Sequence, residues 1–289
     1  MRKMALVWGA WGLVFMFVVF TAAAQSDGPE IKRWEVMEEN EEGEKEPVPY
    51  MSIDGVMVHE YDPAKRPQPR IVAPGAAATR RSTATAPSDA VVLFDGSDLS
   101  NWTSRKEGEP TKWVVKDGVM SPTPDSGQIV SKQRFGSCQL HLEFATPKNV
   151  KGSGQGRGNS GLFLMGAYEV QILDSYENTT YPDGQAGALY GRSAPLVNAS
   201  RGPGEWQSYD VVFHRPIFKD GEVVKQATFT IFHNGVLVQD HYKLTGGTGW
   251  NGPHAVSEYE PHGDKGPIAL QDHGNPVLFR NIWVRELED

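Results

Sequence analysis

The sequence of 289 residues has one cysteine and no excess of positive charge, and both absences exclude functions. Cys138 has no second cysteine with which to form a disulfide within the chain, and one cysteine cannot build a zinc cluster. Cys138 lies in an alternating run, which predicts a buried, small apolar side chain. The formal net charge of −8 gives nucleic-acid binding no electrostatic support.

Motifs of two large enzyme classes are also missing. The glycine-rich segment 152–158 is not followed by G-K-[ST], which excludes a phosphate-cradling loop of the P-loop type. No G-x-S-x-G nucleophile motif occurs, and the lone cysteine is a poor candidate nucleophile. The chemistry of this chain must therefore come from other side chains.

Residues 1–24 have the pattern of a secretory signal. A basic start precedes the apolar run 5–20, and three alanines stand before Gln25. The alternative is an uncleaved membrane anchor, for which the run is short against the ~20 residues of a membrane span. We expect a cleaved signal, export to a periplasm or out of the cell, and no stable membrane span after cleavage.

Residues 25–88 have the composition of a flexible segment. The part 25–49 is strongly acidic, with too few apolar residues to offset its ordering entropy. The part 62–88 is rich in Pro, Ala, Arg and Thr and has no hydrophobic period. Between them, 50–61 could form one short strand or hairpin around Asp54-Gly55. The segment is predicted to be a disordered spacer, with a binding arm as the alternative.

Residues 89–289 contain many short alternating runs and glycine-marked turns, and no run with helical periodicity. In the run 138–145, Leu140, Leu142 and Phe144 share one face while His141 and Glu143 share the other. This pattern predicts one all-β domain, a sandwich of two antiparallel sheets. The strands are expected at 90–94, 113–115, 118–120, 127–130, 138–145, 161–165, 168–173, 206–214, 228–233, 236–241, 268–272 and 277–286.

The hairpin within 158–174 carries the most informative polar residues. Its loop Gly166-Ala167 predicts a type II′ turn, which would place Leu164 opposite Glu169. Glu169 and Gln171 share one strand face, opposite an apolar face that needs a core. A buried carboxylate is costly without a partner, so Glu169 needs water, a charge partner, a metal or a substrate. An ordinary solvent-facing pair remains the alternative.

A second polar group, Gln271-Asp272-His273, ends a predicted strand. A histidine beside a carboxylate can act as a base or as a metal ligand. The alternative is a hydrogen-bonded turn in which His273 has no chemical role. Gln271 and His273 differ by two positions, so they would point the same way if the strand continued.

Several motifs in order resemble the 3-keto-disaccharide hydrolase domain family over residues 90–288. The motifs are FDGSDLSNW (94–102), WVVKDGVM (113–120), GNSGLF (158–163), YEVQILD (168–174), GALYG (187–191), GEWQ (204–207), HNG (233–235) and GPIALQDHG with FRNI (266–282). The resemblance implies a concanavalin A-like jelly roll, export in bacteria and cleavage of glycosides that are oxidised to a ketone at sugar C3.

The chemistry that this resemblance implies does not need two carboxylates. A C3 ketone acidifies the C2 proton, so removal of that proton allows expulsion of the C1 substituent, after which water adds back. The route needs a general base, a group that stabilises the enolate oxygen and an acid for the leaving group. Glu169 or His273 could be the base, and Gln171, Asn159 or a divalent metal, bound by Glu169 and His273, could hold the enolate.

Other residues are candidates for positioning the substrate: Asn159, Asp174, Tyr190, Gln271, Asp272 and Arg280. Arg280 could equally be structural, paired with Glu286 or a loop carbonyl. Aromatic residues of the long loops, Tyr176, Tyr181 and Trp250, could stack on sugar rings.

Three alternatives to a 3-keto-glycoside-cleaving enzyme remain open from the sequence. They are a non-catalytic carbohydrate-binding module on the same fold, a conventional glycoside hydrolase, and an interaction protein that works through 25–88.

Overall fold

The computed structural model describes residues 31–39, 45–53, 56–57, 67–74, 86–106, 109–249 and 257–289. Its strands are β1 (Ile31–Glu39), β2 (Lys45–Ile53), β3 (Val56–Met57), β4 (Val91–Phe94), β5 (Trp102–Ser104), β6 (Val114–Lys116), β7 (Val119–Ser121), β8 (Ile129–Phe135), β9 (Cys138–Ala145), β10 (Ser160–Leu164), β11 (Tyr168–Ile172), β12 (Gln207–His214), β13 (Ile217–Lys219), β14 (Glu222–Lys225), β15 (Thr228–His233), β16 (Val236–Lys243), β17 (Gly266–Leu270) and β18 (Leu278–Glu286). Two short 3-10 turns, Gly154–Gly156 and Pro182–Gly184, are the described helical segments.

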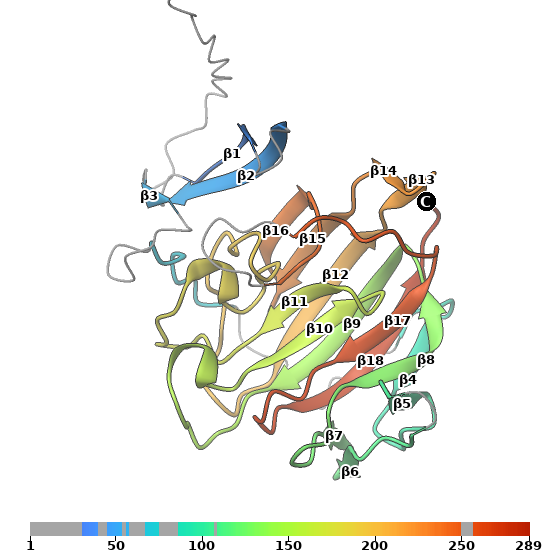
Figure 1. Cartoon of the computed structure of the whole chain (residues 1–289). Coiled ribbons are helices and arrows are strands. Elements are labelled where there is room, and N and C mark those ends of the chain that lie inside the picture. Colours follow the sequence, from blue (N-terminus) through green and yellow to red (C-terminus); the bar gives the residue numbers. More distant parts are fainter. Residues whose placement is uncertain are drawn as a thin grey trace, which may run out of the picture.

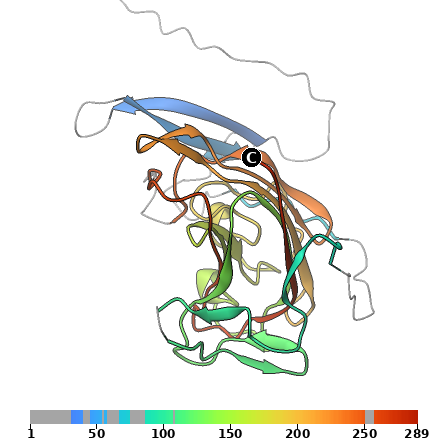
Figure 2. The same cartoon turned by 90° about the vertical axis from the view of Figure 1, so that its right-hand side faces the viewer.

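Two antiparallel sheets form the sandwich (Figures 1 and 2). One has the strand order β11-β10-β17-β8-β5, and the other has the order β16-β15-β12-β9-β18-β7-β6, with β4 on β18. A separate pair, β13-β14, and the three-stranded sheet β1-β2-β3 complete the described strands. The prediction of an all-β, two-sheet sandwich is confirmed.

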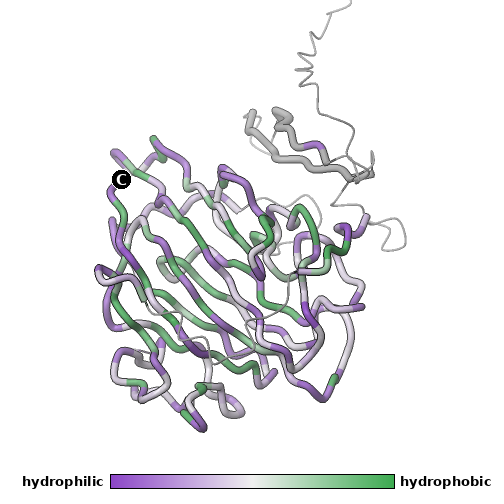
Figure 3. Tube along the Cα trace, turned by 180° about the vertical axis from the view of Figure 1, so that it is seen from behind, coloured by the Kyte–Doolittle hydropathy of each residue, from purple (hydrophilic) through white to green (hydrophobic). Residues whose placement is uncertain are grey.

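The core lies between the two sheets, where their facing apolar side chains meet. In β9, Leu140, Leu142 and Phe144 are fully buried, as their shared parity predicts. In β12 buried and partly exposed positions alternate along the whole strand. Figure 3 shows this alternation as hydrophobic and hydrophilic bands along the strands seen from behind. Each sheet therefore has an outer face, and the candidate sites lie on those two outer faces.

The register of the β10–β11 hairpin differs by one residue from the prediction. Phe163, and not Leu164, lies opposite Glu169. Met165 and Gly166 both have positive φ, 55° and 69°, and the Ala167 N–H donates to the Leu164 carbonyl at 3.1 Å. Two central residues with positive φ define a type I′ turn, and not the predicted type II′. The residues that share the face of Glu169 are consequently Phe163 and Gly161, and not leucines.

The front segment is more structured than its composition predicts. Strands β1 to β3 form an antiparallel sheet, and β2 and β3 flank Asp54-Gly55 as expected for a hairpin. Residues 67–74 contact the loop region: the Val72 N–H donates to the Asn198 carbonyl, and the Asn198 N–H donates to the Arg70 carbonyl, both at 2.9 Å. The predicted flexible character therefore does not apply to 67–74. Residues 25–30, 40–44, 54–55, 58–66 and 75–85, and the signal predicted over 1–24, lie outside the described residues.

Candidate functional site

Glu169 lies on the outer face of the five-stranded sheet, between two neighbouring strands. Phe163 of β10 is opposite it on one side. On the other side, residues 187–190 run along β11 as an added edge segment, in which Leu189 bridges Val170. The Tyr190 N–H donates to the Glu169 carbonyl at 3.2 Å. Because side chains alternate on both segments, Tyr190 shares the face of Glu169.

The Glu169 carboxylate is buried and has no hydrogen-bond donor among the described residues. The residue is only 7% exposed, and burial raises the pKa of the carboxyl to about 8. Gly161 makes this position possible, because a Cβ at residue 161 would collide with Glu169 Oε1 and come within 2.8 Å of the Phe163 ring. A desolvated carboxylate with a pKa near neutrality has the property that a general base needs.

Two tyrosines from the long stretch 175–205 stand beside Glu169. The Tyr181 and Tyr190 hydroxyls lie 2.6 Å apart. Burial raises the pKa of both phenols, and the nearby Glu169 carboxylate also contributes in this direction. Either hydroxyl can be the donor of this hydrogen bond.

Gln171 belongs to a chain of amides with a fixed orientation. Gln155 Nε2 donates to the Gly184 carbonyl at 2.9 Å, so its Oε1 faces Gln171 Nε2, also at 2.9 Å. Asn159 Nδ2 donates to the Gln155 carbonyl at 2.7 Å, and its Oδ1 lies 3.4 Å from Gln171 Nε2. Gln171 Oε1 is buried without a donor among the described residues. Gln171 therefore offers an acceptor on this face, and its donors are committed elsewhere.

Gln271 lies beside this face, while the next two residues turn away from it. The Gln271 N–H donates to the Gly161 carbonyl at 3.0 Å, which extends the pairing of β17 with β10. Asp272 accepts hydrogen bonds from Ser126 and from the Gly127 and Gly274 N–H groups, so it is the centre of a turn. Strand β17 ends at Leu270, so His273 lies in the turn that follows the strand, and it is exposed there. No hydrogen bond or ion pair joins it to Glu169 among the described residues.

Asp174 has a structural partner. Its side chain is buried and accepts a hydrogen bond from Arg157 Nε at 2.8 Å. It borders a cleft of about 510 Å³ at the end of β11. The cleft is lined by residues 147–152, 156–158, 174 and 274–276. Asp174 therefore borders a cleft that Glu169 does not line.

Arg280 does not belong to this site. It lies in β18 of the other sheet, where its Nε donates to Glu143 Oε2 at 2.6 Å. The predicted role in positioning the substrate at Glu169 is therefore wrong, and its partner is neither Glu286 nor a loop carbonyl. No local pattern in the sequence predicts the pair of Arg280 and Glu143, because 137 positions separate the two residues.

The described residues do not fit the metal site that the sequence left open. Among them, no group of three or more His, Cys, Asp and Glu side chains is placed to hold a metal ion.

Of the loop aromatics, Tyr176 is exposed, Tyr181 pairs with Tyr190, and Trp250 lies outside the described residues. Gln155 is a site residue that sequence reasoning missed, because nothing in a glycine-rich loop marks which side chain turns inward. The described helices are all too short or too polar to cross a membrane.

Comparison with known proteins identifies the class. Residues 89–285 match the family model described as a 3-keto-alpha-glucoside-1,2-lyase-like domain. The chain is 23% identical over 245 residues to a 3-keto-disaccharide hydrolase of Bacteroides thetaiotaomicron, covering 68% of this chain and 78% of that protein. A crystal structure of a candidate glycosyl hydrolase from Parabacteroides distasonis is 46% identical, with a TM-score of 0.68, and the match covers 77% of this chain and 93% of that one. A second such structure from the same organism, 21% identical with a TM-score of 0.52, covers 69% and 94% and shares the fold.

These findings define a carbohydrate-active protein of the glycosyl hydrolase type on a β-sandwich. The chain belongs to the 3-keto-alpha-glucoside-1,2-lyase-like domain family.

Proposed function

We propose that this protein cleaves 3-keto-glycosides by elimination, with Glu169 as the general base. The observation that carries the proposal is the Glu169 carboxylate, which is buried beside two phenols and has no donor among the described residues. A structural carboxylate at such a position would be expected to have a charge or hydrogen-bond partner. The family match and the name of the Bacteroides relative support a 3-keto sugar as the substrate.

The proposed reaction uses the residues as follows. The Glu169 carboxylate takes the C2 proton of the 3-keto sugar, and the electron pair moves toward the C3 oxygen. Collapse of this enolate forms the C1–C2 double bond and expels the C1 oxygen substituent. The leaving oxygen needs a proton, which we assign to the Tyr190 hydroxyl because Tyr190 shares the face of Glu169. Water adds to C1 while the proton returns to C2.

The amide chain has a different role from the one the sequence indicated. Because Gln171 Nε2 is committed to Gln155, Gln171 is not the donor for the enolate oxygen. Its Oε1 can accept a hydrogen bond from a sugar hydroxyl instead. Since Glu169 and Gln171 are 7% and 1% exposed, the sugar reaches them only after the covering side chains move.

Export belongs to the same proposal. The charged, apolar and alanine-ending pattern of residues 1–24 would direct the protein to a periplasm or out of the cell. The substrate would then be met outside the cytoplasm.

The decisive test is turnover of a 3-keto-glycoside in D₂O. Elimination followed by water addition places deuterium at C2 of the released 3-keto sugar, whereas direct hydrolysis at C1 does not. A control in which the product is incubated without enzyme corrects for spontaneous exchange.

Glu169→Gln keeps the shape of the side chain and should lower kcat/KM by at least ~100-fold. Normal turnover by this variant would refute the assignment, and binding of the sugar without turnover by the wild type would favour a binding module.

A further inference from the structure

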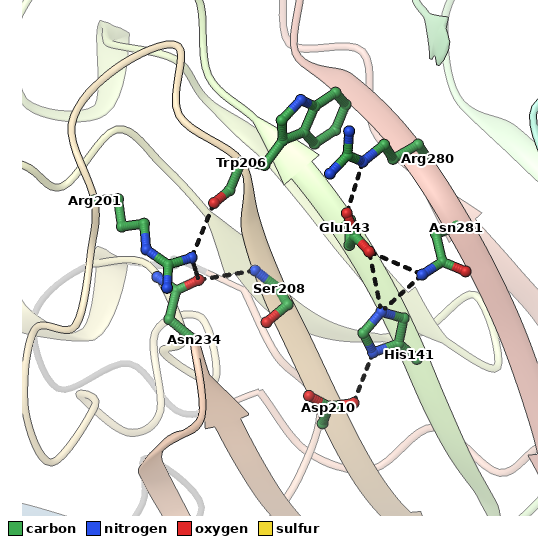
Figure 4. Close-up of polar contacts among 9 residues, drawn as sticks. All are labelled: His141, Glu143, Arg201, Trp206, Ser208, Asp210, Asn234, Arg280 and Asn281. Carbon is green, nitrogen blue, oxygen red and sulfur yellow. Dashed lines mark hydrogen bonds and ion pairs between the residues drawn. The ribbon is translucent and has the colours of Figure 1, made fainter. Parts of the chain in front are cut away.

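The outer face of the eight-stranded sheet carries a polar network on the side of the sandwich away from Glu169 (Figure 4). His141 Nδ1 lies 2.7 Å from Asp210 Oδ1, and its Nε2 lies 3.7 Å from Glu143 Oε1. Glu143 also accepts hydrogen bonds from Arg280 Nε at 2.6 Å and from Asn281 Nδ2 at 2.8 Å. Four charged groups on three adjacent strands are thus held in fixed positions.

Strand register arranges this network in two rows across the sheet. In the first row, Asp210 lies opposite both Phe232 and His141, and His141 lies opposite Trp283. In the second row, two residues along, Glu143 lies opposite both Ser208 and Arg280. Three strand spacings of ~4.8 Å make a row about 14 Å long. We call these two rows the outer-sheet platform: Phe232, Asp210, His141 and Trp283 with Ser208, Glu143 and Arg280.

Aromatic rings frame the platform. Phe232 is 38% exposed at one end of the first row. Trp206, partly exposed, lies beside the second row, where the Arg280 guanidinium stands 3.9 Å from its ring centroid. Trp283 stacks on His141 with ring centroids 5.4 Å apart and fixes the imidazole. Phe232 and Trp206 therefore offer exposed ring area next to fixed polar groups, whereas Trp283 is buried.

The charges of the platform balance. Asp210 and Glu143 are acidic, Arg280 is basic, and the hydrogen bond of His141 to Asp210 and its ion pair with Glu143 hold the proton of His141. Two negative and two positive groups give the two rows no net charge. The Asp210 carboxylate is 42% exposed and the Arg280 side chain is 23% exposed, so an acceptor and a donor face solvent. Hydroxyl groups pair with both.

We propose that the outer-sheet platform binds a neutral oligosaccharide chain laid over it between Phe232 and Trp206. The sugar rings contact the faces of the aromatic residues, and the hydroxyl groups contact Asp210 and Arg280. Because this surface belongs to the other sheet, the bound chain does not occupy the Glu169 site. The platform would hold the protein on a glycan while the catalytic face acts on its substrate.

Affinity electrophoresis of the full chain tests this binding directly. The probes are a soluble mixed-linkage β-glucan, a dextran and an arabinoxylan, with polygalacturonate as the anionic comparison. We expect retardation by at least one neutral glycan. Phe232→Ser and Asp210→Asn, both at exposed positions, should each weaken the retardation at least fivefold, and Trp206→Ala should do so more strongly.

A matched variant separates binding from folding. Val224→Ser changes an exposed apolar residue of β14, away from the platform, and should bind as the wild type does. Thermal melting of each variant controls for folding. The proposal is overturned if no neutral glycan retards the protein, if only polygalacturonate does, or if Phe232→Ser and Asp210→Asn leave retardation unchanged. The readout is binding, so failure of the proposed catalytic reaction would not affect it.

Discussion

Tyr190 is the cross-strand neighbour of Glu169, joined to it by a backbone hydrogen bond of 3.2 Å from the Tyr190 N–H to the Glu169 carbonyl. This pairing brings a phenol from the loop 175–205 onto the face of the buried carboxylate, and Tyr181 completes a hydroxyl pair at 2.6 Å. The arrangement places a phenol beside the proposed base, and we propose that it acts as the acid.

The tyrosine pair should matter for the departure of the leaving group. Tyr190→Phe and Tyr181→Phe remove one hydroxyl each and keep the rings, so we expect kcat on a 3-keto-glycoside to fall ~10²-fold with little change in melting temperature. A substrate with a good leaving group, such as a nitrophenyl 3-keto-glycoside, should be affected much less. Equal losses on both substrates would exclude an acid role.

Glu169 should lower the stability of the protein at alkaline pH. The folded carboxyl has a pKa of about 8, against 4.5 for the free group, so the folded state holds a proton that the unfolded state has lost. Stability therefore falls as pH rises from 4.5 to 8, on the order of 1.4 kcal/mol for each pKa unit.

Glu169→Gln has no such proton and should melt at a higher temperature than the wild type. The difference should be small at pH 5, grow up to about pH 8 and stay level above it. Calorimetry over this range measures the effect. A difference that is independent of pH would show that Glu169 is not desolvated as the structure indicates.

His141 should stabilise the folded protein, whereas Glu169 should destabilise it. Burial lowers its pKa, but hydrogen bonds and charge interactions with Asp210 and Glu143 outweigh burial and raise the pKa to about 9. Its stabilising effect is fully present below pH 6.5 and is lost as pH rises through 9. His141→Gln should therefore be less stable than the wild type at pH 6, by about 1–3 kcal/mol, and the gap should narrow by pH 9.5. Measurement in a Glu169→Gln background removes the titration of Glu169.

Gly161 should be intolerant of a side chain. A methyl group there meets Glu169 Oε1 and the Phe163 ring, so Gly161→Ala should displace the carboxylate and lower kcat/KM at least ~10-fold, with a loss of about 1–3 kcal/mol in stability. Gly263→Ala is the matched control, because nothing lies within 4 Å of a Cβ at that residue. Unchanged turnover by Gly161→Ala would mean that the Glu169 rotamer is not the active one.

The sequence determined the strands and their faces, because alternation is a local property of the chain. The parity of Glu169 with Gln171, and of Leu140 with Phe144, can be assigned before any partner strand is known. The order of motifs also indicated the family. The strand β5 and the hairpin β13–β14 were missed because they are short, with at most four residues each.

Tertiary structure alone decided which residues meet. Arg280 and Trp283 differ by three positions, so simple alternation would place them on opposite faces of β18. A bulge at Asn281, whose φ is 49°, inserts one extra residue and returns both side chains to the outer face. The turn at Met165-Gly166 likewise set the neighbours of Glu169, and the edge segment 187–190 brought Tyr190 to it. Bulges, turn types and edge pairing depend on contacts between residues far apart in the chain, and local periodicity carries no information about such contacts.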